Sequence, residues 1–225
     1  MRKTRRNRID FGNPFRYDES EMKHGGDAGM KIYDISQEVF SCAVYPGDPA
    51  PQKQLLSATA DGALYNLTAF SMCAHNGTHV DAPFHFLGDG KTVERMELDI
   101  FVGDCYVAHH AGFVTANDAR NILQKAEGAE RILIAGSVTV TAEAAEVFAA
   151  AGIKLLGNES QSVGPEDAPM QVHKILLQQG IALLEGVVLT DVPEGCYFLS
   201  AAPLNLAGAD GAPCRAYLMN MEETR

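Results

Sequence analysis

Residues 75–86, HNGTHVDAPFHF, gather three of the seven histidines of this chain with an aspartate, a glycine and a proline. Imidazole nitrogens and carboxylate oxygens are ligands that suit zinc and, less specifically, manganese or another first-row metal. A lone buried histidine is most often a hydrogen-bonded core residue. Packing does not readily explain three histidines within eleven residues beside the chain breakers Gly77 and Pro83. The stretch therefore predicts a metal or catalytic site.

The spacing of these residues favours an extended or turning chain over a helix. His75 and His79 have the i, i+4 spacing of the zinc-protease helix, but asparagine stands where that helix carries its glutamate. In an extended chain alternate residues share a face, and Asn76-Gly77 permits a turn that brings His75 toward His79. His79 and Asp81 then point to the same side. Three protein ligands leave a position for water, which hydrolysis requires.

Composition bounds the kind of protein that carries this stretch. The chain has 225 residues, of which 46% are hydrophobic and 21% charged, enough for one large domain or two small ones. The net charge of −11 and the pI near 5.0, without a basic stripe, argue against partners such as nucleic acid or an anionic membrane. No apolar run reaches the roughly 18 residues that span a bilayer. Five scattered cysteines without a CxxC motif predict no disulfide framework and a cytoplasmic location.

Charge divides the chain near Met30. Residues 1–29 carry a net charge of +2, and residues 30–225 carry −13. The first segment lacks apolar periodicity and has no secretory signal, so we predict a disordered or loosely attached extension. Met30 could be the true start of the protein, and a basic segment that docks on a partner is the alternative. Residues 30–225 are predicted to form a single domain.

The remaining sequence alternates strand and helix patterns. Helices are predicted from capping residues and apolar spacing over 115–128, 141–152 and 168–180, the first two opening on threonine. Strands first and then helices between short apolar strands imply an α/β fold, with a mixed sheet covered by helices on one side. A short strand pair is expected to close the chain. The other strands are predicted at 31–35, 65–73, 101–110, 131–136, 153–157 and 181–186.

The pattern His75-x-Gly-Thr-His79-x-Asp81-x-Pro-x-His85 resembles the signature of the cyclase family of metal-dependent hydrolases, which includes bacterial kynurenine formamidases and isatin hydrolases. All seven fixed positions are present. The resemblance runs from about Met30 to the C-terminus and includes YPGDP at 45–49 and GADGAPCRA at 208–216. It implies a swivelling β/β/α domain, with a mixed sheet or flattened barrel and outer helices. It also implies a homodimer or homotetramer whose active site lies near a subunit interface.

The resemblance further implies the second half of the site. Formamidases of this kind share a downstream histidine and glutamate twelve residues apart, and His173 and Glu185 have that spacing here. His75, His79 and Asp81 would bind a first zinc ion, or manganese, and His173 a second, with Asp81 and Glu185 bridging the two. Taken alone, His173 could be an ordinary helix-face histidine. Glu185 ends the apolar run IALLEG, where a carboxylate needs a partner.

His85 would then be the general acid and base rather than a ligand, because imidazole can move a proton from attacking water to a leaving nitrogen near neutral pH. The metals would acidify that water and polarise the substrate carbonyl.

One loop departs from the formamidase pattern. Formamidases commonly show an aspartate, a proline and a second aspartate around a Ser-Val pair, where this chain has Glu159, Gln161 and Gly164. We expect the loop 157–165 to shape the substrate pocket or to support the residues that surround the metal ligands. Tryptophan is absent, so an aryl-binding wall must use phenylalanine or tyrosine. The candidates, each of which could equally belong to the core, are Tyr45, Phe70, Phe84 and Phe86.

The working hypothesis is a metal-dependent amidohydrolase for a small-molecule formamide or cyclic amide, with N-formylkynurenine, cleaved to kynurenine and formate, as the named substrate. A metal-dependent cyclase or dehydratase acting on a carbonyl substrate is the alternative enzyme. A metal- or ligand-binding protein without turnover is the alternative from another class. That reading has no need for His85 beside an open metal position.

Overall fold

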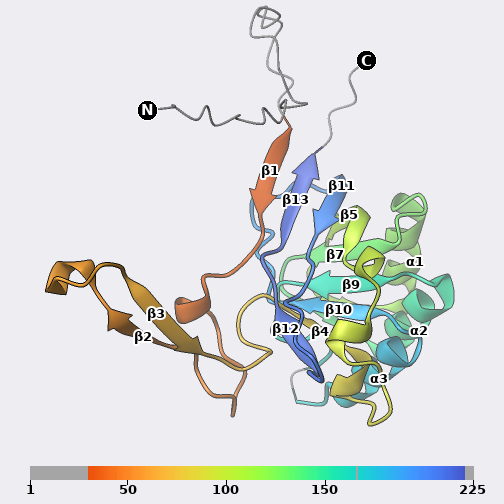
Figure 1. The fold of residues 1–225 in the computed structure, drawn as a ribbon. Coiled ribbons are helices and arrows are strands. Elements are labelled where there is room, and N and C mark those ends of the chain that lie inside the picture. Colours follow the sequence, from red (N-terminus) through yellow and green to blue (C-terminus); the bar gives the residue numbers. More distant parts are fainter. Residues whose placement is uncertain (1–29, 166, 221–225) are drawn as a thin grey trace, which may run out of the picture.

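The computed structural model describes residues 30–165 and 167–220, and the predicted extension over residues 1–29 lies outside them. A curved sheet of nine strands forms the centre of the protein (Figure 1). Its four middle strands run parallel, and the strands at both sides pair antiparallel. In sheet order the strands are β1 (Lys31–Asp34), β13 (Tyr217–Asn220), β11 (Gly195–Ser200), β5 (Val102–His109), β7 (Arg131–Ala135), β9 (Leu155–Asn158), β10 (Ala182–Glu185), β4 (His79–Asp81) and β12 (Gly211–Pro213).

Three helices connect successive parallel strands and lie together on one face of the sheet (Figure 1). They are α1 (Ala116–Lys125), α2 (Ala142–Ala151) and α3 (Met170–Gln178). Thr115 and Thr141 cap the first two helices with their side chains, as predicted, and the left-handed Gly152 ends α2. Helix α1 stops at Lys125, before the predicted Gly128, and α3 is two residues shorter at each end than predicted.

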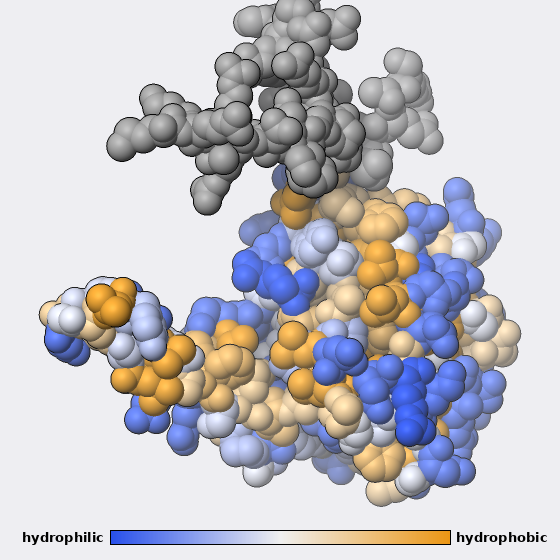
Figure 2. Space-filling model, viewed as in Figure 1, coloured by the Kyte–Doolittle hydropathy of each residue, from blue (hydrophilic) through white to orange (hydrophobic). Residues whose placement is uncertain are grey.

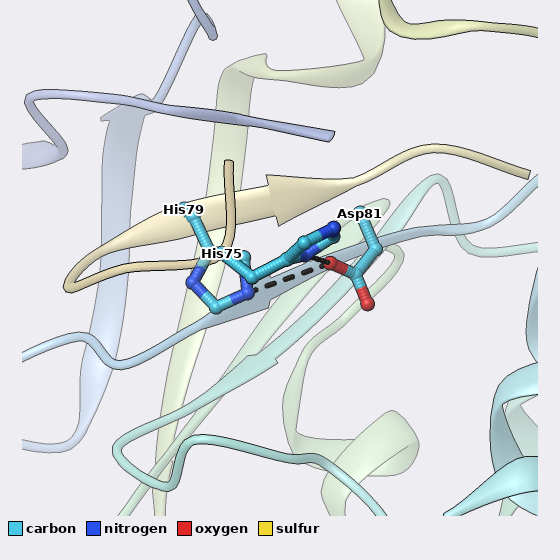
Figure 3. Close-up of side chains that lie close together, drawn as sticks. All are labelled: His75, His79 and Asp81. Atoms are coloured by element: carbon cyan, nitrogen blue, oxygen red, sulfur yellow. Dashed lines mark hydrogen bonds and ion pairs between the residues drawn. The ribbon is translucent and has the colours of Figure 1, made fainter. Parts of the chain in front are cut away.

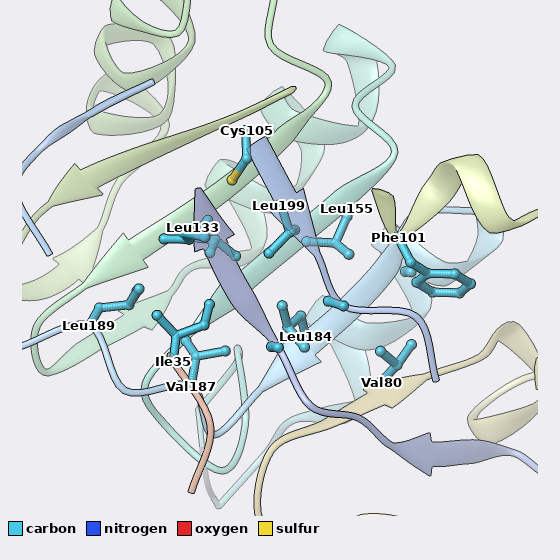
Figure 4. Close-up of a cluster of buried hydrophobic side chains, with 14 of the residues drawn as sticks. Ile35, Val80, Phe101, Cys105, Leu133, Leu155, Leu184, Val187, Leu189 and Leu199 are labelled. Atoms are coloured by element: carbon cyan, nitrogen blue, oxygen red, sulfur yellow. The ribbon is translucent and has the colours of Figure 1, made fainter. Parts of the chain in front are cut away.

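The core has two layers because neighbouring residues of a buried strand face opposite ways. Leu133 and Leu184 pack inside the curve of the sheet (Figure 4), whereas Ile132 and Leu183 pack against the helices. All four side chains are fully buried. Burying each contributes about 1.5–3 kcal/mol to stability, so the strands that carry the site are held on both faces.

Two small sheets lie outside the main one. Strands β2 (Gln52–Ser57) and β3 (Leu67–Ser71) form an antiparallel hairpin, here called the arm (residues 52–71), which projects from the body (Figure 1). Strands β6 (Gly112–Val114) and β8 (Val138–Val140) pair in parallel. Of these four strands only β3 was predicted, and the closing segment holds three strands rather than a pair.

The predicted fold class is confirmed: a mixed, curved sheet carries its helices outside. None of the helices in residues 30–165 and 167–220 combines the length and apolar character that crossing a membrane needs.

Candidate metal centre

Strand β4 lies between β10 and β12, and this register sets the floor of the site. His79 stands opposite Glu185, and Asp81 stands opposite Leu183. Val80, between them, is buried in the core. His79 and Asp81 therefore point to the opposite face, where they meet Glu185.

A glycine turn carries His75 over this floor. Gly77 adopts a left-handed backbone with φ of 67°, which a glycine adopts without strain. Residues 75–81 are not helical, as predicted, and the His75 and His79 rings lie 5.0 Å apart, centre to centre. A side chain at Gly211 would place its Cβ 2.8 Å from His75 Cε1, so β12 must present a glycine there.

His75, His79 and Asp81 form the first cluster that could hold a metal ion (Figure 3). Asp81 Oδ1 lies 2.8 Å from His75 Nδ1 and 3.4 Å from His79 Nε2. His79 Nδ1 donates a hydrogen bond to the Gly77 carbonyl at 3.0 Å. This bond fixes the ring and leaves Nε2 available to a metal ion, as in many metal sites.

Asp81, His173 and Glu185 form a second cluster beside the first. His173, on α3, donates from Nδ1 to the Pro169 carbonyl at 2.9 Å. Its Nε2 lies 3.2 Å from Glu185 Oε1 and 3.6 Å from Asp81 Oδ2. The structure thus brings together all five side chains that the sequence nominated as ligands, with Asp81 common to both clusters.

The floor of the site strongly favours positive charge. Burial by itself would lower the pKa of His79, but hydrogen bonds to Asp81 and Glu185 outweigh it and raise that pKa to about 10. Burial would raise the pKa of Asp81, but hydrogen bonds from His75 and His79 hold it well below its usual range. Asp81 and Glu185 are 1% and 4% exposed. Two buried carboxylates therefore attract either protons on the histidines or metal cations.

Asp81 Oδ2 provides a direct test of whether the site fits a metal. This oxygen is buried and has no hydrogen-bond partner in the described structure. A buried carboxylate oxygen without a hydrogen bond is costly, and the His173 Nε2 at 3.6 Å lies beyond hydrogen-bond distance. A cation between Asp81, His173 and Glu185 would supply its missing partner, so the donor set fits a divalent metal.

His85 lies at the more open side of the site. It ends a short 3-10 turn, Pro83–His85, and its Nδ1 lies 3.0 Å from Asp210 Oδ2. His75 Nε2 lies 2.9 Å from the same oxygen. Asp210 was not nominated from the sequence. Its signal was its place in GADGAPCRA, immediately before β12.

A cavity of about 270 Å³ opens above these side chains. Tyr45 and Phe86 line it, as two of the predicted aryl-wall candidates, whereas Phe70 and Phe84 are partly exposed and do not. Gln161 and Ser162 of the divergent loop also line it, as expected of that loop. The remaining lining residues are Asp48, His75, His79, His85, Pro169, His173 and Glu185.

His109 and His110 lie elsewhere, at the end of β5. His109 Nε2 donates to the Val192 carbonyl and His110 Nε2 to the Phe113 carbonyl. In the described part of the chain neither belongs to a cluster that could hold a metal.

The sequence matches known proteins over most of its length. It is 34% identical over 207 residues to a kynurenine formamidase of Erythrobacter litoralis, covering 86% of this chain and 95% of the relative. It is 35% identical over 206 residues to a kynurenine formamidase of Salinibacter ruber, covering 84% and 97%.

Solved structures share the fold. A potential metal-dependent hydrolase with cyclase activity superposes with a TM-score of 0.75 at 29% identity, over 86% of this chain and 100% of the other. Isatin hydrolase A of Labrenzia aggregata gives a TM-score of 0.74 at 21% identity, over 86% and 94%. The family described as "Putative cyclase" matches residues 27–165, which is more than half of the sequence. With this match and the formamidase relatives, the chain belongs to the cyclase family.

Proposed function

We propose that residues 30–225 form one metal-dependent amidohydrolase domain that cleaves an aryl formamide, N-formylkynurenine, to kynurenine and formate. One observation carries the proposal: four of the nominated ligand residues and His85 line a single cavity, and the fifth, Asp81, lies beneath it with an unpaired oxygen. The relatives named kynurenine formamidase, about a third identical over most of the chain, support the choice of substrate.

The proposed cofactor is zinc, or manganese, at two neighbouring positions. His75, His79 and Asp81 would hold one ion, and His173 and Glu185 would hold the other together with Asp81. Nitrogen and oxygen ligands without sulfur suit both metals. When bound, such ions lower the pKa of a coordinated water and polarise a carbonyl.

In this proposal His85 moves the proton. Asp210 accepts a hydrogen bond from Nδ1 and turns Nε2 toward the cavity floor, 4.0 Å from Asp81 Oδ2. From there Nε2 takes a proton from the water that attacks the formyl carbon. It returns that proton to the ring-bound nitrogen as the C–N bond breaks, which releases the aniline and formate.

The cavity walls suit the aryl part of the substrate. Tyr45, Phe86 and Pro169 supply apolar surface around the polar floor. The Phe86 ring centre lies 4.6 Å from those of both His85 and His173, which places an aromatic face beside the reacting groups.

The test is hydrolysis of N-formylkynurenine by chelator-treated protein before and after addition of zinc or manganese, followed by kynurenine absorbance. Metal-restored turnover is expected. Full metal binding without turnover would reject the formamide substrate and direct attention to a carbonyl cyclase, a dehydratase or a binding protein.

We also propose that the chain assembles as a homodimer or homotetramer through the arm. Two-stranded hairpins are marginal on their own, yet the arm exposes a set of large apolar side chains (Figure 2). The chain reaches the arm directly from Tyr45 and Asp48 in the cavity wall, so a second copy seated there would lie near the active site. The exposed residues are Leu55, Leu56, Leu64, Tyr65, Leu67 and Phe70.

A cytoplasmic location completes the proposal. All five cysteines are free, and Cys105 is fully buried. Free thiols persist in reducing compartments.

A further inference from the structure

Gln161 has an amide group for which the described structure offers no partner. The residue lines the cavity above the metal centre. Both its Nε2 and its Oε1 are shielded from solvent, and neither makes a hydrogen bond. An amide that is desolvated and unpaired is unfavourable. A ligand in the cavity that offers one acceptor and one donor would satisfy it.

The backbone around Gln161 is tied to the metal centre. The Val163 N–H donates to Glu185 Oε1 at 2.8 Å, and the Gly186 N–H donates to the Ser160 carbonyl at 2.8 Å. Glu159 accepts hydrogen bonds from the backbone N–H groups of Gly136 and Leu189. Gln161 therefore sits on a fixed segment, two residues from an atom that contacts a nominated ligand.

The composition and size of the cavity indicate which substrate group the Gln161 amide can contact. Lys and Arg are absent from its described lining, so the positive charge of the cavity is confined to the histidines of the floor and any metal they hold, and Gln161 is an uncharged N–H donor on the wall. Because the cavity is only about 270 Å³ in volume, a substrate group next to the scissile bond must contact the cavity wall. Consider a formanilide substrate with its formyl group at the nominated ligands and its ring beside Phe86. The ring substituent ortho to the formamide is then the group that meets Gln161.

We propose that Gln161 is a specificity residue that selects formanilides carrying a carbonyl group ortho to the scissile formamide. Nε2 donates to the ortho carbonyl oxygen, and Oε1 accepts from the anilide N–H. The inference rests on the proposed hydrolase function and deepens it. N-formylkynurenine has this ortho carbonyl, whereas formanilide does not.

The experiment compares kcat/KM for 2′-formamidoacetophenone and for formanilide, using zinc-loaded full-length protein. Gln161→Leu removes the amide at similar size, and Gln161→Glu keeps the acceptor but removes the donor. Gln171→Leu, an exposed position on the neighbouring α3, is the matched control.

We expect both Gln161 variants to lower kcat/KM for the ortho-acyl substrate about tenfold more than for formanilide. Gln161→Leu should also weaken formanilide hydrolysis, because the anilide N–H that Oε1 accepts is common to both substrates. Gln171→Leu should leave both values unchanged. Equal losses on both substrates, or loss of bound zinc, would overturn the role of Gln161 while the hydrolase stands. If the wild-type protein hydrolyses neither substrate, the proposed function itself fails and takes this inference with it.

Discussion

His85 and Asp210 lie 125 positions apart in the chain and meet at the open side of the cavity. His85 is 28% exposed, whereas His79 and His173 are almost fully buried. This difference suits the proposed task of His85, because a proton carrier must reach substrate and water.

Replacing His85 with alanine should lower kcat/KM for N-formylkynurenine by about 100-fold or more, because the proton carrier is lost. Bound metal, measured by elemental analysis, should stay unchanged. His110→Ala is the matched control, since that imidazole lies outside the clusters in the described residues. Full turnover by the His85 variant would remove it from the mechanism.

Asp210 is a positioning residue in this scheme. Asp210→Ala should reduce kcat roughly tenfold with KM little changed, because the His85 ring loses its orienting partner. Asp210→Asn retains an acceptor oxygen and should recover most of the loss. A fall in metal content in the alanine variant would instead assign Asp210 to the ligands.

Spacing in the sequence nominated His79 and Asp81, because alternate residues of an extended chain share a face. His173 and Glu185 were nominated through the family resemblance, since a helix residue and a strand residue twelve positions apart carry no pattern of their own. Asp210 was not predicted as a site residue because a single aspartate before a three-residue strand shows no characteristic spacing. Phe70 and Phe84 were considered for the aryl wall because type alone does not tell which way a side chain points.

At the scale of elements, two features position neighbouring elements. They are the Gly77 turn before β4 and the hydrogen bonds through which Glu194 joins α1 to β5. Capping residues made α1 and α2 predictable. Strands β6 and β8 were missed because three residues are too few to show alternation.

Gly77→Ala should destabilise the protein by about 1–2 kcal/mol, because alanine is strained in a left-handed backbone and its Cβ would lie 3.3 Å from Cys42 Cβ. Metal affinity should also fall, since the Gly77 carbonyl orients His79. Urea unfolding and metal titration provide the two measurements. Gly88→Ala has open space and an ordinary backbone, so it should change neither value.

Glu194 joins α1 to β5. Hydrogen bonds from Lys125 and then Tyr106 lower its pKa from 4.5 to about 2. A carboxyl whose pKa is lowered by folding stabilises the protein at every pH above its unfolded-state pKa. This contribution is lost as pH falls from about 4.5 toward about 2.

Glu194→Gln should therefore cost roughly 1 kcal/mol at neutral pH, the scale of a partly exposed ion pair. The difference from the wild type should shrink as urea unfolding is repeated at lower pH across that window. A difference that stays constant with pH would show that the charge of Glu194 is irrelevant.

At the scale of the whole molecule, the arm is the feature that a single copy leaves uncovered. Leu55 and Leu64 are 58% and 96% exposed. Apolar surface gathered in this way marks contact sites. The resemblance to a family gave the expectation of an oligomer, but proposing the arm as the contact needed coordinates, because strand β2 was not predicted.

The double variant Leu55→Lys/Leu64→Lys should shift the mass measured by light scattering toward that of a monomer, because two charges cannot be buried at the contact. Phe113→Lys replaces an apolar residue of similar exposure on β6 and should leave the mass unchanged. An unchanged mass in the double variant would place the contact elsewhere.

The position of β4 in the sheet also governs when the site can exist during protein synthesis. The histidine-rich segment leaves the ribosome early, but both strands that flank β4, and Asp210, come much later in the chain. A nascent chain therefore exposes His75 and His79 long before Glu185 can pair with them. The proposed metal ligands are complete only once Glu185 has been synthesised, and a chain that terminates before Asp210 would keep those ligands but lack the partner of His85 and the strand β12 beside β4.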